Sequence, residues 1–230
     1  MELTLIVAAL PSLIWLFFFL REDIHPEPKW MLARVFFLGA VGMVVAGVIQ
    51  VVLQRWLISF EIGTYSALTL FLFAAIEEVL KFFAAYFAVI KSKLFDERVD
   101  AMIYMITAAM GFAMAENIAV LWGAALTATS VAIMTMRFIG AVLLHALASG
   151  VVGYYLARAL RFKEQVGAEN TGHYMLIVRG LFIATLLHGI FNYLIITTGN
   201  AVAFPLLFLI IVALLVFRNF ETLKRGPTAS

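Results

Sequence analysis

Long apolar runs alternate with short polar segments along the whole chain. The runs cover residues 3–20, 31–53, 65–90, 101–123, 131–157, 174–197 and 202–217. Each is close to the roughly 20 residues that about 30 Å of hydrocarbon requires of a membrane-spanning helix. The intervening segments contain proline, glycine or charged residues, which interrupt helices. The pattern predicts an all-α, polytopic transmembrane helix bundle of about seven spans, folded as a single domain over residues 1–230.

The composition supports a lipid environment. The chain is 64% hydrophobic and 13% charged, whereas soluble domains are about half apolar and a quarter charged. We therefore expect the lipid bilayer as a partner and no nucleic acid. We expect the first run to remain as a mature helix, because no basic residue precedes it and Arg21-Glu22-Asp23 follows without a cleavage site. The absence of cysteine excludes disulfides, thiolate metal sites and a cysteine nucleophile.

The distribution of Lys and Arg predicts the orientation in the membrane. Basic residues gather in alternate loops and at the C-terminus, whereas the other loops hold only Arg55. The positive-inside rule therefore places the N-terminus outside and the C-terminus in the cytosol. The predicted cytosolic set is Arg21, Lys29, Arg34, Lys91, Lys93, Arg98, Arg158, Arg161, Lys163, Arg218, Lys224 and Arg225.

Several ionisable residues fall inside the apolar runs, where they oppose membrane insertion. A charge at the centre of a spanning helix costs about 2.5–3.5 kcal/mol, so Glu77, Glu78 and Lys81 together would cost roughly 8–10 kcal/mol. We infer that this helix faces the interior of the bundle. Arg179 lies near a predicted cytosolic end and could extend to the interface. The full set is Glu77, Glu78, Lys81, Glu116, Arg137, His145, Arg179 and His188.

Helical spacing places these residues on common faces. The pairs Glu77/Lys81, His145/Ser149 and His188/Asn192 are each four residues apart, and Glu116-Asn117 adds a fourth polar position. Glu77, His145 and His188 are all expected near mid-bilayer, on three different helices. Any one of them alone could serve only to form a hydrogen bond between helices, but the whole set predicts one buried functional cluster. Arg137 could be a counter-charge for the glutamates or an interfacial anchor.

The cluster fits the hydrolysis of a peptide bond by an activated water molecule. One of Glu77 and Glu78 could act as general base while the other holds a proton. Glu116 and His145 would position water or tune protons, and His188 with Asn192 would stabilise the oxyanion. Lys81, Asn117, Arg137 and Ser149 would support these groups. Covalent catalysis by Ser149 is less well supported, because the serine has no evident paired base.

Other functions remain open at this stage. A metal, with zinc as the natural choice, could be held by Glu77, Glu116, His145 and His188, although no HExxH motif occurs. A proton- or ion-coupled transporter would also need buried carboxylates and histidines, but usually has inverted repeats and broken helices. A non-catalytic scaffold would not need Glu77.

The motifs also carry a family resemblance. They are Asp23…Glu27-Pro28, Glu77-Glu78-Val79-Leu80-Lys81, Asp100…Tyr104, Gly111-Phe112-Ala113-Met114-Ala115-Glu116-Asn117, His145…Ser149-Gly150 and His188-Gly189-Ile190-Phe191-Asn192. The set resembles the PrsW family of bacterial intramembrane proteases, relatives of the CAAX-processing endopeptidases and bacteriocin-processing membrane proteins. One departure is Ala109, which stands where a glycine is common.

The resemblance implies a multi-pass protein of the bacterial inner membrane. It also implies a water activated by Glu77 with Glu78 in support, and a metallopeptidase label. The substrate it implies is a membrane protein, and some members carry out site-1 cleavage of membrane-anchored anti-sigma factors.

Overall fold

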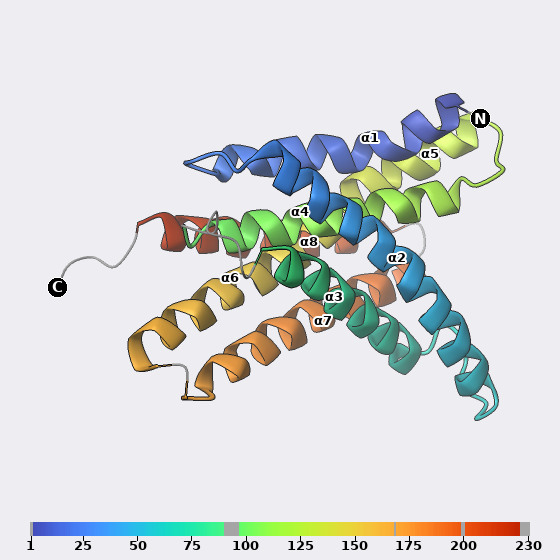
Figure 1. The fold of residues 1–230 in the computed structure, drawn as a ribbon. Coiled ribbons are helices and arrows are strands. Elements are labelled where there is room, and N and C mark those ends of the chain that lie inside the picture. The colour runs from blue at the N-terminus through green and yellow to red at the C-terminus, as the bar shows by residue number, and fades with distance from the viewer. Residues whose placement is uncertain (1, 90–96, 168, 199–200, 226–230) are drawn as a thin grey trace.

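The computed structural model describes residues 2–89, 97–167, 169–198 and 201–225, and the described residues are helices joined by short turns (Figure 1). The helices are α1 Glu2–Phe19, α2 Lys29–Ile58, α3 Ala67–Val89, α4 Asp100–Val120, α5 Ala128–Arg137, α6 Leu143–Val166, α7 Gly172–Thr198 and α8 Ala203–Lys224. A short 3₁₀ turn, Leu20–Glu22, follows α1. The predicted all-α architecture is confirmed.

The number of spans also agrees with the prediction of about seven. Six helical segments of the described chain are long and apolar enough to cross a membrane. One of them runs without interruption from Ala128 to Val166 and includes both α5 and α6. The remaining long helix is α3, whose 23 residues include Glu77, Glu78 and Lys81. These three charged residues make α3 too polar to be a span on its own. They are the residues from which the sequence analysis inferred that this helix faces the interior of the bundle.

The long helix from Ala128 contains an irregular turn. At its start, the Thr127 side chain accepts a hydrogen bond from the backbone N–H of Ser130, and the Ser130 side chain caps Thr127 in return. Between α5 and α6, residues Phe138–Val142 adopt π-helical geometry. The sequence analysis did not predict this turn, which lies one turn before His145. π-Helical turns of this kind are frequent at functional sites.

Helix α4 forms the centre of the bundle. It packs against α1, α2, α3 and α6, while α7 packs against α3 and α6, and α8 against α6 and α7. Figure 1 shows α4 running between these neighbours. Most of α4 is buried, as expected for a helix that is apolar on all sides. The bundle therefore surrounds the helix that carries Glu116.

Two glycines let α2 and α4 approach closely. A Cβ atom on Gly39 would lie 2.0 Å from the carbonyl oxygen of Ala108, and a Cβ on Gly111 would lie 1.8 Å from that of Phe36. Neither position can accept a side chain without separating the two backbones. Small residues at such crossings are characteristic of membrane helix packing. Gly39 and Gly111 are thus close-packing points between α2 and α4.

Candidate functional site

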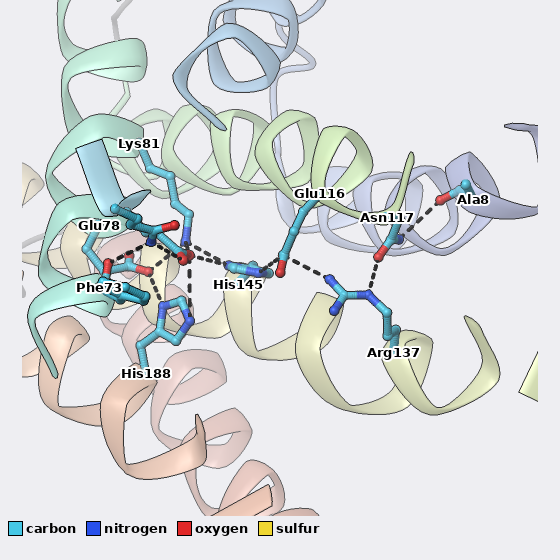
Figure 2. A network of polar contacts seen from close by, with 11 residues as sticks. Ala8, Phe73, Glu78, Lys81, Glu116, Asn117, Arg137, His145 and His188 are labelled. Carbon is cyan, nitrogen blue, oxygen red and sulfur yellow. Dashed lines mark hydrogen bonds and ion pairs between the residues drawn. The ribbon is translucent and has the colours of Figure 1, made fainter. Parts of the chain in front are cut away.

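Polar side chains from four helices meet in the middle of the bundle (Figure 2). Helix α3 contributes an acidic pair and a lysine, α4 one glutamate, α6 a histidine and a serine, and α7 the second histidine. We call this set the central cluster: Glu77, Glu78, Lys81, Glu116, His145, Ser149 and His188. The structure brings together Glu78 and His188, which are 110 positions apart in sequence, as the common depth and helical spacing indicated.

The most deeply buried part of the central cluster is an ion pair within α3. Lys81 Nζ lies 2.7 Å from Glu78 Oε1, and both side chains are fully buried. Glu78 also accepts a hydrogen bond from Ser149 Oγ at 3.3 Å and lies 2.9 Å from His188 Nδ1. Every described partner of this carboxylate is therefore a donor. Such a fully satisfied buried carboxylate holds its neighbours in place.

The two histidines are each held by a different glutamate. His188 Nδ1 faces Glu78 Oε1 at 2.9 Å, and His145 Nε2 faces Glu116 Oε2 at 2.9 Å. The two rings are perpendicular, with centroids 5.0 Å apart. A carboxylate acceptor on one ring nitrogen fixes the N–H there and leaves the lone pair on the other nitrogen of the neutral ring. These remaining nitrogens, His188 Nε2 and His145 Nδ1, both face Glu77.

Glu77 is bound differently from Glu78. Its Oε1 accepts a hydrogen bond of 3.0 Å from Gln50 on α2, whereas its buried Oε2 lacks a hydrogen-bond donor among the described residues. That oxygen lies 3.7 Å from His188 Nε2 and 4.0 Å from His145 Nδ1. The Glu77 side chain is 14% exposed. An oxygen and two nitrogens with lone pairs thus converge on one small space.

The structure adds Gln50 to the site, a residue that the sequence analysis missed. Its Nε2 also lies 3.4 Å from the carbonyl oxygen of Phe73, so that the amide links α2 to α3. The available signal was weak, because Gln50 is an uncharged polar residue inside the 31–53 run, and an uncharged amide is much less costly in a spanning helix than a carboxylate.

A second set of contacts extends from Glu116 away from the central cluster. Arg137 forms an ion pair of 2.9 Å with Glu116, which supports its assignment as a counter-charge. The Arg137 Nε donates to Asn117 Oδ1 at 2.6 Å, and Asn117 Nδ2 donates to the carbonyl oxygen of Ala8 at 3.1 Å. Figure 2 shows this chain of contacts leading from His145 to α1. Asn117 therefore lies outside the central cluster and links α4 to α1.

Asn192 lies one turn beyond His188 on α7 and is partly exposed. The hydrogen bonds of the central cluster, within the described residues, involve His188 and not Asn192. Its predicted contribution to an oxyanion site therefore stays a prediction.

The donor set of the central cluster fits a divalent metal. One ligand atom from each of Glu77, His145 and His188 lies within 4.8 Å of the others. Two imidazoles and one carboxylate are a common catalytic zinc set, and Glu77 Oε2, which lacks a hydrogen-bond donor among the described residues, could supply the third ligand. Glu116 lies outside this trio and contacts His145 Nε2 at 2.9 Å, so its predicted part in a metal site stays a prediction. Lys81 Nζ, however, lies 2.7 Å from His145 Nδ1, which is the nitrogen that would have to bind the metal.

The remaining family motifs meet at another place, around the start of α4. The backbone N–H of Glu27 donates to Asp23 Oδ2 at 3.1 Å, and that of Glu97 donates to Asp100 Oδ2 at 2.8 Å. The Tyr104 hydroxyl donates to Glu27. Asp23, Glu97 and Asp100 each offer an oxygen within 4.8 Å of the others. These contacts connect the α1–α2 loop to α4.

Burial raises the pKa of Asp23 in this acidic group, and the nearby Glu97 acts in the same direction. A raised pKa in the folded state means that ionisation of Asp23 opposes folding as the pH rises above the usual aspartate value. Asp23→Asn is therefore expected to raise the free energy of unfolding at pH 7 and to leave it unchanged near pH 3. Detergent unfolding at both pH values measures this, with the exposed Glu164→Gln as control. Equal effects at both pH values would contradict the electrostatic explanation.

The fold and site together define the class of this protein. It is a multi-pass membrane protein with a buried centre of glutamates and histidines. The sequence model of "PrsW family intramembrane metalloprotease" matches residues 27–217. The chain therefore belongs to the PrsW family, and it is by that membership an intramembrane peptidase of bacterial type.

Individual relatives agree with this assignment. Protease PrsW of Bacillus subtilis is 30% identical over 195 residues, which cover 84% of this chain and 83% of the relative. Protease PrsW of Oceanobacillus iheyensis is 28% identical over 187 residues, covering 80% and 79%. Protease PrsW of Clostridioides difficile is 27% identical over 195 residues, covering 83% and 78%. No solved structure matches the chain. The family favours a peptidase over the transporter that the sequence analysis left open.

Proposed function

We propose that this protein hydrolyses a peptide bond of another membrane protein by using Glu77 to activate a water molecule. The observation that carries the proposal is the buried Glu77 Oε2, which lacks a hydrogen-bond donor while it faces His188 Nε2 and His145 Nδ1. Because Lys81 Nζ lies 2.7 Å from His145 Nδ1, Glu77 Oε2 and His188 Nε2 are the two acceptors left for a water molecule, which can donate two hydrogen bonds. The three helices of the cluster other than α3, namely α4, α6 and α7, lie in segments long and apolar enough to cross a membrane, so that the substrate bond would have to reach the cluster within the bilayer.

The proposed reaction divides the work between the two adjacent glutamates. Glu77 accepts a proton from water as the oxygen attacks the carbonyl carbon, which gives a tetrahedral intermediate. Glu77 then passes this proton to the amide nitrogen as the C–N bond breaks. Glu78, fully buried and already bonded to Lys81 and His188, would hold the geometry and not exchange protons.

The histidines have distinct roles in this scheme. His188 Nδ1 lies 2.9 Å from Glu78 Oε1. Its Nε2, which first accepts a hydrogen bond from the water, would take up a proton from solvent and then donate it in a hydrogen bond to the oxyanion, with Glu78 stabilising the imidazolium. Asn192 is proposed as a second oxyanion donor from the next turn of α7. His145, held by Glu116, would orient the water. Arg137 and Ser149 support Glu116 and Glu78 respectively.

A metal could also be held by Glu77, His145 and His188. When bound there, it would polarise the substrate carbonyl and lower the pKa of a coordinated water. Zinc is our choice among the metals for two imidazoles and a carboxylate. Among substrates, we propose a membrane protein with a single span, of which a membrane-anchored anti-sigma factor is the example that the family resemblance suggests.

Co-expression of this protein with single-span substrate candidates tests the proposal. Wild-type protein is expected to release a shortened product, and Glu77→Ala is expected to release none. Membranes are then assayed with and without a chelator. Cleavage that survives chelation supports hydrolysis by Glu77 without a metal, and cleavage that chelation abolishes supports the metal-bound form. Cleavage by Glu77→Ala at the wild-type rate would remove Glu77 as the base.

A further inference from the structure

Lys81 occupies an unusual place inside the central cluster. Its side chain is fully buried, and its ammonium group lies 2.7 Å from both Glu78 Oε1 and His145 Nδ1 and 3.7 Å from Glu77 Oε2. The ammonium also lies 4.7 Å from the centre of the Phe112 ring, which adds a favourable cation–π contact. The lysine thus places a positive charge beside two of the three residues that could bind a metal.

The contact with His145 determines which proton the imidazole carries. An ammonium group has three N–H donors and no lone pair. His145 Nδ1 must therefore be the accepting nitrogen, and Nε2 carries the proton that faces Glu116 at 2.9 Å. Glu116 and Lys81 hold the same tautomer from opposite sides of the ring. Nδ1 is then the one lone pair that His145 offers towards Glu77.

A metal ion at the Glu77, His145 and His188 trio would need that same lone pair. A zinc–imidazole bond is about 2.0–2.1 Å long, and one nitrogen lone pair cannot serve both a metal and an ammonium group. Two cations would also repel each other at this distance in a water-poor site. Lys81 could withdraw without losing all its partners, because Glu78 is three residues away on the same helix.

We propose that Lys81 and a divalent metal ion compete for His145 Nδ1, so that Lys81 sets the metal affinity of the central cluster. In the lysine-bound state, the ammonium group supplies the positive charge that Glu77 and Glu78 require. In the metal-bound state, the ion supplies it. The inference rests on the proposed function only in taking the central cluster as the reaction site. It makes Lys81 a positioning residue that selects between the two states.

Titration of the purified protein with Co²⁺ in detergent tests the competition. Co²⁺ substitutes for zinc and gives a visible absorption band when imidazole and carboxylate bind it in a tetrahedral site. Lys81→Gln removes the charge and retains an amide that can donate to Glu78. This variant is expected to bind Co²⁺ at least about tenfold more tightly than wild type, a change of the size produced by other groups that adjoin metal ligands. Lys163→Gln, at an exposed position, is expected to match wild type.

A double variant tests the same proposal without leaving either charge of the buried pair unpaired. Glu78→Gln with Lys81→Met removes both charges of the pair and keeps an acceptor for His188. It is also expected to bind Co²⁺ more tightly than wild type, and His145→Ala in either background is expected to abolish the absorption band. The proposal is overturned if both Lys81 variants retain wild-type helical content and elution volume but bind Co²⁺ no more tightly than wild type.

The Co²⁺ titration needs no substrate, so its outcome is independent of peptidase activity. Tighter binding by the Lys81 variants together with a wild-type protein that cleaves no candidate would support the competition and count against the proposed function. Cleavage that depends on Glu77, combined with unchanged Co²⁺ affinity in both variants, would support the function and reject the competition.

Discussion

Replacing Glu77 by glutamine is expected to lower the kcat of peptide hydrolysis by about 10²–10⁴-fold, the usual contribution of a general base. Glutamine has nearly the same shape and can still bond to Gln50, which contacts Glu77 Oε1 at 3.0 Å. The variant removes the basic oxygen that faces the two histidines, with little change in packing. Single-turnover cleavage of a single-span substrate in proteoliposomes measures the rate without the contribution of product release.

The matched control for this experiment is Glu164→Gln, which makes the same chemical change at an exposed position of α6. It is expected to cleave at the wild-type rate. The folded state of each variant can be compared by gel filtration and circular dichroism. A Glu77→Gln protein that folds normally and keeps more than about a tenth of the wild-type kcat would show that another group activates the water.

Replacing Glu78 by leucine is expected to lower the free energy of unfolding by about 3–5 kcal/mol, because it leaves a buried charge without its partner. Lys81 would keep only Glu77 Oε2, at 3.7 Å, as a carboxylate neighbour. The donors His188 Nδ1 and Ser149 Oγ would also lose their acceptor. Unfolding in mixed micelles with increasing sodium dodecyl sulfate, followed by circular dichroism, measures the loss.

A double variant identifies the source of that loss. Glu78→Leu with Lys81→Met replaces the whole ion pair by apolar side chains, a change that is often neutral in buried sites. It is expected to recover at least half of the stability that Glu78→Leu loses, which would be a clear departure from additivity. If Glu78→Leu alone costs less than about 1 kcal/mol, the ion pair is not a significant part of the fold.

The fold could be predicted largely because membrane insertion imposes a simple constraint. Every spanning segment must be long, apolar and helical, so that seven runs of the sequence indicate seven long helical segments. Charges inside those runs are costly, and the same cost made Glu77, Glu78 and Lys81 conspicuous. Spacing of four residues then placed Ser149 beside its histidine on one face, where the structure has it. The orientation in the membrane stays a prediction.

Other parts of the site depend on how separate helices pack, which a single sequence does not encode locally. Helical spacing alone could not show that Asn117 faces Ala8 and Arg137 while its neighbour Glu116 faces His145. Gln50 lies 27 residues from Glu77, and its uncharged amide is only a weak signal within the apolar run around it. The pairing of each histidine with a particular glutamate likewise became visible only in three dimensions.

The π-helical turn Phe138–Val142 has a consequence for how Glu116 is held. Arg137 and His145 lie on either side of this turn, eight positions apart. A π turn takes up one extra residue, so the two behave as if seven positions apart, which is close to two full turns of an α-helix. Both side chains therefore project in the same direction, and each lies 2.9 Å from the same oxygen, Glu116 Oε2. In a regular helix, one of the two side chains would point away from Glu116. The π turn therefore allows two side chains of a single continuous helix to bind the same carboxylate oxygen.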